Sequence, residues 1–84
     1  MTWPGRLSLV RRHHWGTTSW WNDEEGFGVI TSPDFEGDIW VHFSTLQMGG
    51  YRSLRKGEAV EFREVMTPGL EPGYPHQAFW VRPL

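Results

Sequence analysis

Two short runs of alternating aromatic and small residues carry the side chains of this sequence that are best suited to bind a ligand. They are Gly26-Phe27-Gly28-Val29-Ile30 and Ile39-Trp40-Val41-His42-Phe43. Successive side chains of a strand point to opposite faces, so Trp40 and His42 share one face of the second run. If the two runs pair side by side, Phe27 joins them in one flat aromatic patch. Large rings in a row on the outside of a small sheet indicate a ligand with flat faces.

The sequence offers no accompanying arrangement for catalysis or for metal binding. It contains no Ser-His-Asp set with supporting spacing and no phosphate-binding Gly-Lys-Thr motif. Acidic pairs such as Asp23-Glu24 stand in an expected turn, where a solvated charge is the usual case. His13 and His14 have no nearby thiolate or carboxylate in the sequence, and metal sites need three or four converging ligands. We therefore expect no enzyme, no metal, no cofactor and no small-molecule substrate.

Length and composition limit how the rings can be arranged. The chain has 84 residues, which make one small domain, and includes six tryptophans, five phenylalanines and two tyrosines. A domain of this size buries only about 60–65% of its unfolded surface, so some rings must stay partly in water. There is no cysteine, and no apolar run approaches the roughly 18 residues of a membrane span. These features predict a soluble cytoplasmic protein without a membrane partner.

The pattern of apolar and turn residues predicts an all-β domain. β-Branched and aromatic content or clean alternation indicates five strands, with turn residues between them, at residues 15–22, 26–31, 38–43, 58–65 and 76–82. Residues 44–47 suffice for a single helical turn, and the proline- and glycine-rich segment 66–75 is expected to be a surface loop. Closing five short antiparallel strands into a small barrel would remove exposed edges and leave one convex face for a ligand.

Alternation within these strands separates the expected core from the expected surface. The predicted core residues are Trp21, Ile30, Val41, Val60, Phe62 and Val81. Phe27 and Trp40 are expected in solvent, because glycines flank Phe27 and the rings exceed what the core can hide. Phe43 is suited to either place. For Trp80 and Tyr74, both an extension of the patch and a cap over the 66–75 loop stay open.

Charge divides the chain into a basic start and an acidic body. The net charge is −2, yet Arg6, Arg11 and Arg12 precede every acid, and all Asp and Glu residues lie after residue 15. Residues 1–14 show no sustained period, so we predict a flexible basic arm there and a folded domain over residues 15–84. We expect a monomer, although pairing of Leu7–Val10 with a neighbour's sheet edge leaves a dimer through the arm open.

From Gly16 to the C-terminus the sequence resembles the bacterial cold-shock proteins, which are small five-stranded OB-fold barrels that bind single-stranded nucleic acid. Gly26-Phe27-Gly28 with Ile30 matches the first ribonucleoprotein motif of that family, and residues 38–44 match the second. Further matching positions precede and follow the two motifs, among them Gly16-Thr17, Leu54, Gly57 and Val60-Glu61-Phe62. Two motifs in order, at the correct separation and followed by a matching tail, make the resemblance specific.

The resemblance implies both a site and a function. The base-stacking positions of the family fall on Trp20, Phe27, Trp40, His42, Phe43 and Tyr51, and the polar positions beside them on Asn22, Asp38 and Gln77. Phe43 breaks simple alternation, which we attribute to a bend at the end of its strand. The implied partner is single-stranded RNA or DNA bound by base stacking, and the implied role is that of an RNA chaperone or transcript regulator.

Several positions depart from the family pattern. The family usually has lysine where this chain has Ser19 and Glu25, an aromatic residue at Val29, and a core valine at Thr18. Fewer cations weaken attraction to phosphate, and one lost ring removes about 1–3 kcal/mol of stacking. We expect binding that is weaker than typical, or that borrows charge from the arm. The alternative function is a protein–protein interaction module that uses the aromatic patch.

Overall fold

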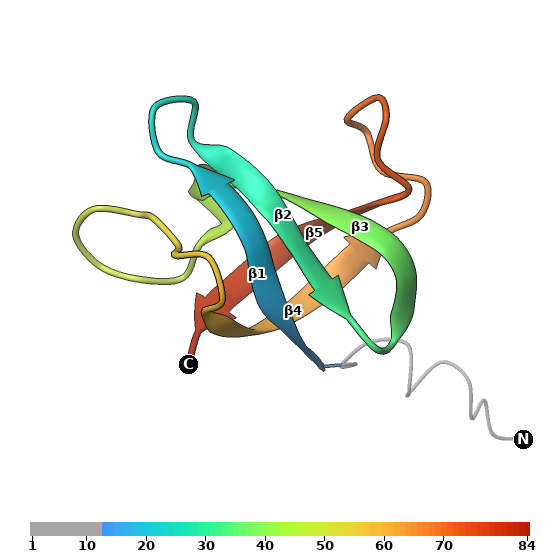
Figure 1. Ribbon diagram of the computed structural model, residues 1–84, viewed down its shortest axis with the longest axis horizontal. Coiled ribbons are helices and arrows are strands. Elements are labelled where there is room, and N and C mark those ends of the chain that lie inside the picture. The colour runs from blue at the N-terminus through green and yellow to red at the C-terminus, as the bar shows by residue number, and fades with distance from the viewer. Residues whose placement is uncertain (1–12) are drawn as a thin grey trace, which may run out of the picture.

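Five strands and one short 3₁₀ turn make up the described part of the chain (Figure 1). The computed structural model describes residues 13–84, and residues 1–12 of the basic arm predicted over residues 1–14 lie outside the described residues. The elements are β1 (His14–Asn22), β2 (Phe27–Ser32), β3 (Phe35–His42), η1 (Phe43–Thr45), β4 (Ala59–Met66) and β5 (His76–Pro83). The prediction of an all-β domain of five strands is confirmed.

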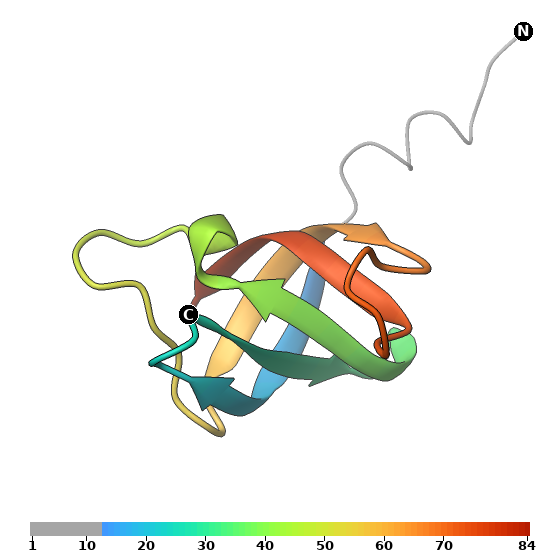
Figure 2. The same cartoon turned by 90° about the horizontal axis from the view of Figure 1, so that it is seen from above.

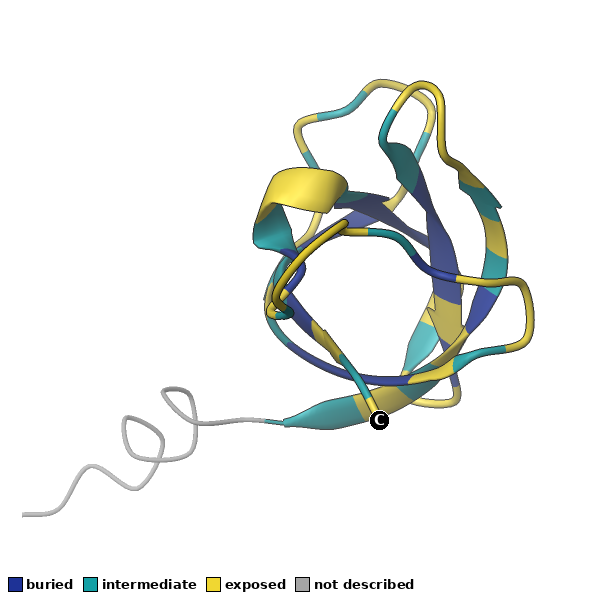
Figure 3. Cartoon of the chain, turned by 90° about the vertical axis from the view of Figure 1, so that its left-hand side faces the viewer, coloured by how far each residue is buried: buried dark blue, intermediate teal, exposed yellow. Residues whose placement is uncertain are grey.

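The strands close into a barrel in the order β1-β2-β3-β5-β4. Figures 2 and 3 show the closure from above and from one end. Four of the pairings are antiparallel, whereas β3 and β5 run parallel. An odd number of strands cannot alternate in direction all the way round a closed ring, so one parallel pair is unavoidable. The barrel is therefore the predicted one, with a single pairing that the expectation of antiparallel strands did not include.

The observed strand boundaries differ most from the predicted ones at the β2–β3 connection. The sequence predicted a turn from Ser32 to Gly37, but β3 already begins at Phe35. The Ser32 hydroxyl accepts a hydrogen bond from the Asp34 amide at 3.2 Å and donates one to the Trp15 carbonyl at 2.8 Å. These bonds close a tight turn and tie it to β1. The other strands begin and end within one residue of their predicted limits.

Apolar side chains from β2, β3, β4 and β5 fill the barrel. The buried cluster consists of Ile30, Ile39, Val41, Leu46, Leu54, Val60, Phe62, Ala78 and Val81. Five of the six predicted core residues belong to it, and the sixth, Trp21, is partly buried and packs against it. Leu46 and Leu54 come from the long connection between β3 and β4 and cover the barrel from that side. Across residues 13–84 no helix is long and apolar enough to cross a membrane.

The two histidines at the start of the described chain, which the sequence assigned to the arm, contact the folded domain and are only partly exposed. His14 opens β1, its Nδ1 lies 2.8 Å from Asp34 Oδ2, and its ring packs against Phe35 and Phe62. His13 Nδ1 contacts the carboxylate of Glu61. Both partners are distant in sequence, so a search for carboxylates near His13-His14 along the chain could not find them.

Glu61 lies on the outer face of β4 yet is only 4% exposed. Arg82 of β5 donates to it through Nη2 at 2.6 Å, and Arg63 approaches it at 3.5 Å. The hydrogen bond from Arg82, opposed by burial and reinforced by His13, lowers the pKa of Glu61 below its ordinary value of 4.5. Arg63 also lies over the Trp80 ring, 3.8 Å from its centroid. Trp80 is thus paired with Arg63 across β4 and β5 and does not extend the aromatic patch.

Replacing Glu61 by glutamine should lower the melting temperature at neutral pH. A carboxylate whose pKa is depressed in the folded state stabilises the fold above the unfolded value of 4.5, and this contribution is lost as pH falls through the lower folded pKa. The gap in melting temperature between the parent and Glu61→Gln should therefore narrow below that pH. Thermal unfolding followed by circular dichroism from about pH 7 to about pH 3 measures it. A gap independent of pH would show that Glu61 acts through its shape and not its charge.

Candidate nucleic-acid interface

Register across β1, β2 and β3 places the predicted ring positions on one outer face. Phe27 lies directly opposite His42, and Val29 lies opposite Trp40 on one side and Trp20 on the other. The alternation argument for Phe27, Trp40 and His42 is therefore confirmed. In β1 a bulge between Thr18 and Trp20 shifts the register by one residue. Because of this bulge Thr18 faces inward while Trp20 reaches the outer face.

Five rings form a continuous chain across this face, which we call the aromatic row: Trp20, Phe27, Trp40, His42 and Phe43. The centroids of successive rings are 5.8, 5.6, 5.9 and 4.6 Å apart in that order. The first pair meets edge to face, and the other three are tilted by 32–36°. The rings come from three neighbouring strands and from η1. They present a single stepped surface that matches the flat faces of successive bases.

Trp40 is less exposed than the sequence predicted. It is 9% exposed, so the expectation of a ring open to solvent is wrong for this residue. It is not part of the buried core cluster, and its ring lies between Phe27 and His42 on the outer face. Packing by these neighbours leaves only a limited surface of Trp40 for a ligand, and Trp20 and Phe43, at 37% and 41%, offer more.

Val29 explains part of this close packing. It is fully buried although it lies on the outer face, and its direct cross-strand neighbours are Trp20 and Trp40. A small side chain at the centre of the row leaves room for larger neighbours to close over it. No base can stack on Val29. The row therefore has one stacking position fewer than it would have with the aromatic residue that is usual in the family at this position.

The end of β3 turns Phe43 onto the same face as His42. The strand ends at His42, whose Nδ1 accepts a hydrogen bond from the Ser44 amide at 3.2 Å and so caps η1. The Phe43 amide donates to the Gly26 carbonyl at 2.8 Å. Gly26 has a φ of +76°, and a Cβ there would come within 2.6 Å of the Phe43 ring. Glycine is needed at this position for both reasons, and the expected bend at the strand end is present.

The three predicted polar residues lie around the aromatic row and differ in exposure and in hydrogen bonding. Asn22 is opposite Phe27, and its Oδ1 accepts from the Glu25 amide at 2.9 Å, which closes the β1–β2 turn. Asp38 is exposed on β3, two residues before Trp40. Gln77 lies next to Trp40 but is only 6% exposed.

Gln77 fixes a loop in place, and its carbonyl is not open to a ligand. Its Oε1 accepts hydrogen bonds from the amides of Leu70 and Glu71, at 2.8 and 3.1 Å. Gly69 packs so closely that a Cβ there would come within 2.8 Å of the Gln77 side chain. The 67–75 loop is thereby bound to β5, through the residue that is the cross-strand neighbour of Trp40.

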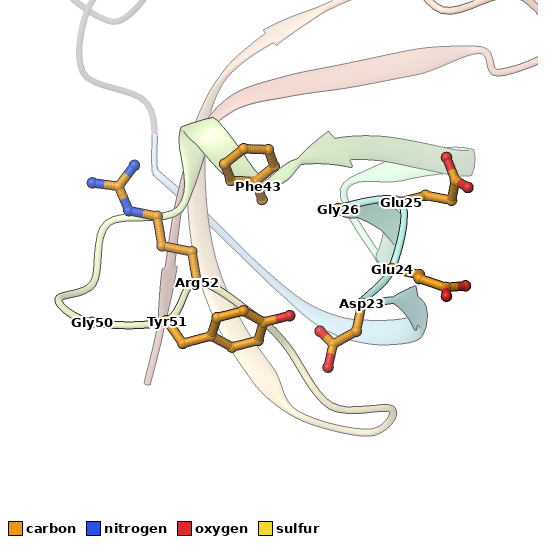
Figure 4. A pocket seen from close by; sticks show the side chains of 8 residues that line it. All are labelled: Asp23, Glu24, Glu25, Gly26, Phe43, Gly50, Tyr51 and Arg52. Carbon is orange, nitrogen blue, oxygen red and sulfur yellow. The ribbon is translucent and has the colours of Figure 1, made fainter.

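Tyr51 stands apart from the row, across a pocket of about 490 Å³. It is 71% exposed and lies in the connection between η1 and β4. Phe43 and Tyr51 both line the pocket, together with Gly50, Arg52 and the turn residues Asp23 to Gly26 (Figure 4). The pocket continues the aromatic surface beyond Phe43, so the sixth predicted ring position joins the site through it.

Comparison with known proteins identifies the family. Residues 14–70 match the family described as the 'Cold-shock' DNA-binding domain. The chain belongs to the cold-shock domain family. A cold shock protein CspA of Staphylococcus aureus is 50% identical over 50 residues, which cover 60% of this chain and 74% of that protein. A cold shock-like protein CspD of Vibrio cholerae is 43% identical over 53 residues, which cover 63% of this chain and 70% of the relative.

Among residues 13–84 of this cold-shock domain, no Lys or Arg lies over a ring of the aromatic row, and Arg63 lies over Trp80 instead. Within residues 13–84, Arg63 and Arg82 lie beside Glu61 on β4 and β5. Arg52 lines the pocket, which also carries the carboxylates of Asp23, Glu24 and Glu25. The described cations near the rings therefore provide little attraction for phosphate.

Two features of this cold-shock domain were not predicted from the sequence. Asp23 is exposed, as expected of a turn charge, but it also lines the pocket and accepts hydrogen bonds from Trp21 Nε1 and Ser53 Oγ. The second is the burial of Glu61 beside Arg82. In each case one partner is far away in sequence, Ser53 for Asp23 and Arg82 for Glu61, so local pattern could not indicate the contact.

Proposed function

We propose that this protein binds single-stranded RNA or DNA by stacking unpaired bases along the aromatic row. The supporting observation is the unbroken series of ring contacts from Trp20 to Phe43 across three neighbouring strands. Each stacked base contributes about 1–3 kcal/mol with little dependence on sequence, because every base has a π-face. Phe43 and Trp20 offer the largest ring surfaces, while Phe27 and His42 are partly buried and connect them through Trp40.

Such binding gives the protein the activity of an RNA chaperone or a transcript regulator. A strand held by its bases cannot pair with itself, so weak secondary structure opens without ATP. His42 takes part with its imidazole held by Ser44 through Nδ1. Its second ring nitrogen can form a hydrogen bond to a base or sugar. We further propose that the protein acts as a monomer in the cytoplasm, as expected from its cysteine-free sequence.

Titration with a thymine heptamer, followed by tryptophan fluorescence, tests the proposal. Trp20 and Trp40 lie in the row, so stacking should quench their emission at micromolar strand concentrations. A longer thymine strand annealed to its complement, so that the duplex is stable at the assay temperature, should give little quenching, because its bases are then already stacked. Absence of quenching by the single strand at tens of micromolar would favour the other function, a protein–protein module that uses the same rings.

Binding should depend only weakly on salt. Each phosphate that a cation neutralises contributes a slope of about −0.7 to the plot of log K against log salt for single strands. With few cations near the row, we expect one to three such contacts and a slope of about −0.7 to −2. Repeating the titration at several sodium chloride concentrations measures the slope. A slope that corresponds to six or more contacts would contradict affinity dominated by stacking.

A further inference from the structure

The pocket beyond Phe43 combines ring surfaces with a carboxylate at its edge. Phe43 and Tyr51 are both well exposed and line the same space of about 490 Å³. The β1–β2 turn supplies Asp23 from the other side (Figure 4). A single base is the part of a bound strand that fits such a space, because its faces suit the rings and its polar edge can meet the turn.

Asp23 is held in one orientation by two hydrogen bonds. Its Oδ1 accepts from Trp21 Nε1 at 3.1 Å and from the Ser53 hydroxyl at 2.6 Å. The bond from Ser53 connects the β1–β2 turn to the chain between η1 and β4, and both of these segments contribute lining residues to the pocket. Within residues 13–84, Oδ2 has no such hydrogen bond, so it is the oxygen that can face a ligand. A fixed acceptor selects among ligands better than a mobile one.

An ionised carboxylate accepts hydrogen bonds and donates none. It therefore favours a base edge that carries N–H groups and opposes an edge of carbonyl oxygens. Thymine and uracil present one imino N–H between two carbonyls, whereas guanine presents its imino N–H beside an amino group. Glu24 and Glu25 also line the pocket and add to this preference. Arg52 is the one Lys or Arg among the residues that line the pocket, and in Figure 4 its guanidinium points away from the acidic turn.

We propose that this pocket selects guanine over thymine or uracil at one position of the bound strand, with Asp23 Oδ2 accepting from the base. The inference rests on the proposed function and adds a base preference to it. The stacking surfaces of the aromatic row tolerate any base, so selection is confined to the single nucleotide that enters between Phe43 and Tyr51.

A guanine moved stepwise through a thymine heptamer tests the preference. At one position the guanine heptamer should bind about fivefold or more tightly than the all-thymine strand, the effect of a partly exposed hydrogen bond to a charged acceptor. Hypoxanthine at that position lacks only the amino group and should lose most of the gain. Equal affinities for every heptamer would overturn the inference and leave the proposed function intact, whereas no binding by any heptamer would overturn both.

Asp23→Asn is the matched variant. Asparagine keeps an oxygen for Trp21 and Ser53 but replaces Oδ2 with a donor amide, so the ratio of guanine to thymine affinity should fall to about one or below. Glu36→Gln removes the same charge from an exposed side chain on β3, away from the pocket, and should leave the ratio unchanged. A ratio that stays at its parent value in Asp23→Asn, or falls equally in both variants, would overturn the assignment.

Discussion

Replacing Phe27 by alanine should weaken binding of a thymine heptamer by about 1–3 kcal/mol, or roughly 5- to 150-fold. Phe27 contacts both Trp20 and Trp40, so its removal takes away one stacking surface and also separates the first ring from the rest of the row. The barrel should remain folded, because Phe27 lies outside the buried core cluster. Fluorescence titration gives the affinity, and thermal unfolding confirms the fold.

Trp15→Ala is the control for this variant. Trp15 is on β1 like Trp20 and is 55% exposed, but its one ring contact among the described residues is with His13. Its removal should change the affinity less than about twofold, as expected of a surface change away from the site. Equal losses in Phe27→Ala and Trp15→Ala would indicate that the chain binds through scattered rings and not through the aromatic row.

Gly28→Ala should destabilise the barrel and also reduce binding. A Cβ at Gly28 would come within 2.4 Å of the Trp20 carbonyl oxygen and 2.6 Å of the Trp21 ring. Backbone atoms of β1 cannot move aside without breaking the β1–β2 pairing, so we expect a loss of about 1–3 kcal/mol or more in the free energy of unfolding. Trp20 would also shift away from Phe27. Urea denaturation measures the first effect, and heptamer titration at a temperature where the variant is folded measures the second.

Gly49→Ala offers a matched control for the glycine substitution. No atom lies within 4 Å of a Cβ at this position, and its backbone is not left-handed. The free energy of unfolding should therefore change by less than about 0.5 kcal/mol. If Gly28→Ala were as mild as Gly49→Ala, the close approach of β1 and β2 beneath the row would be wrong.

The strands, and the face of the sheet on which the rings lie, could be predicted because both follow from local alternation. Phe27, Trp40 and His42 share a face since side chains of a strand alternate and β2 and β3 are adjacent hairpin strands. Trp20 and Trp21 point to opposite faces for the same reason. The positions of Trp20 and Phe43 in the row came from the family resemblance, because a bulge in β1 and the start of η1 interrupt simple alternation at these residues.

The accessibility of these rings could not be predicted from local pattern. Trp40 is only 9% exposed, with its ring packed between Phe27 and His42, and this packing is a property of the assembled barrel. The burial of Glu61 and the fixed position of Asp23 likewise depend on partners from other strands and loops. Alternation reports which face a side chain is on, whereas its exposure depends on what else packs on that face.

The most direct test of stacking along the row is a nuclear magnetic resonance titration with the thymine heptamer. Indole Nε1–H signals of Trp20 and Trp40, and amide signals of Phe27, His42 and Phe43, should shift most as the strand is added. The indole signals of Trp15 and Trp80, which lie outside the row, should stay in place. Shifts confined to Trp15, Trp80 and the strands around them, with the row unmoved, would contradict the account.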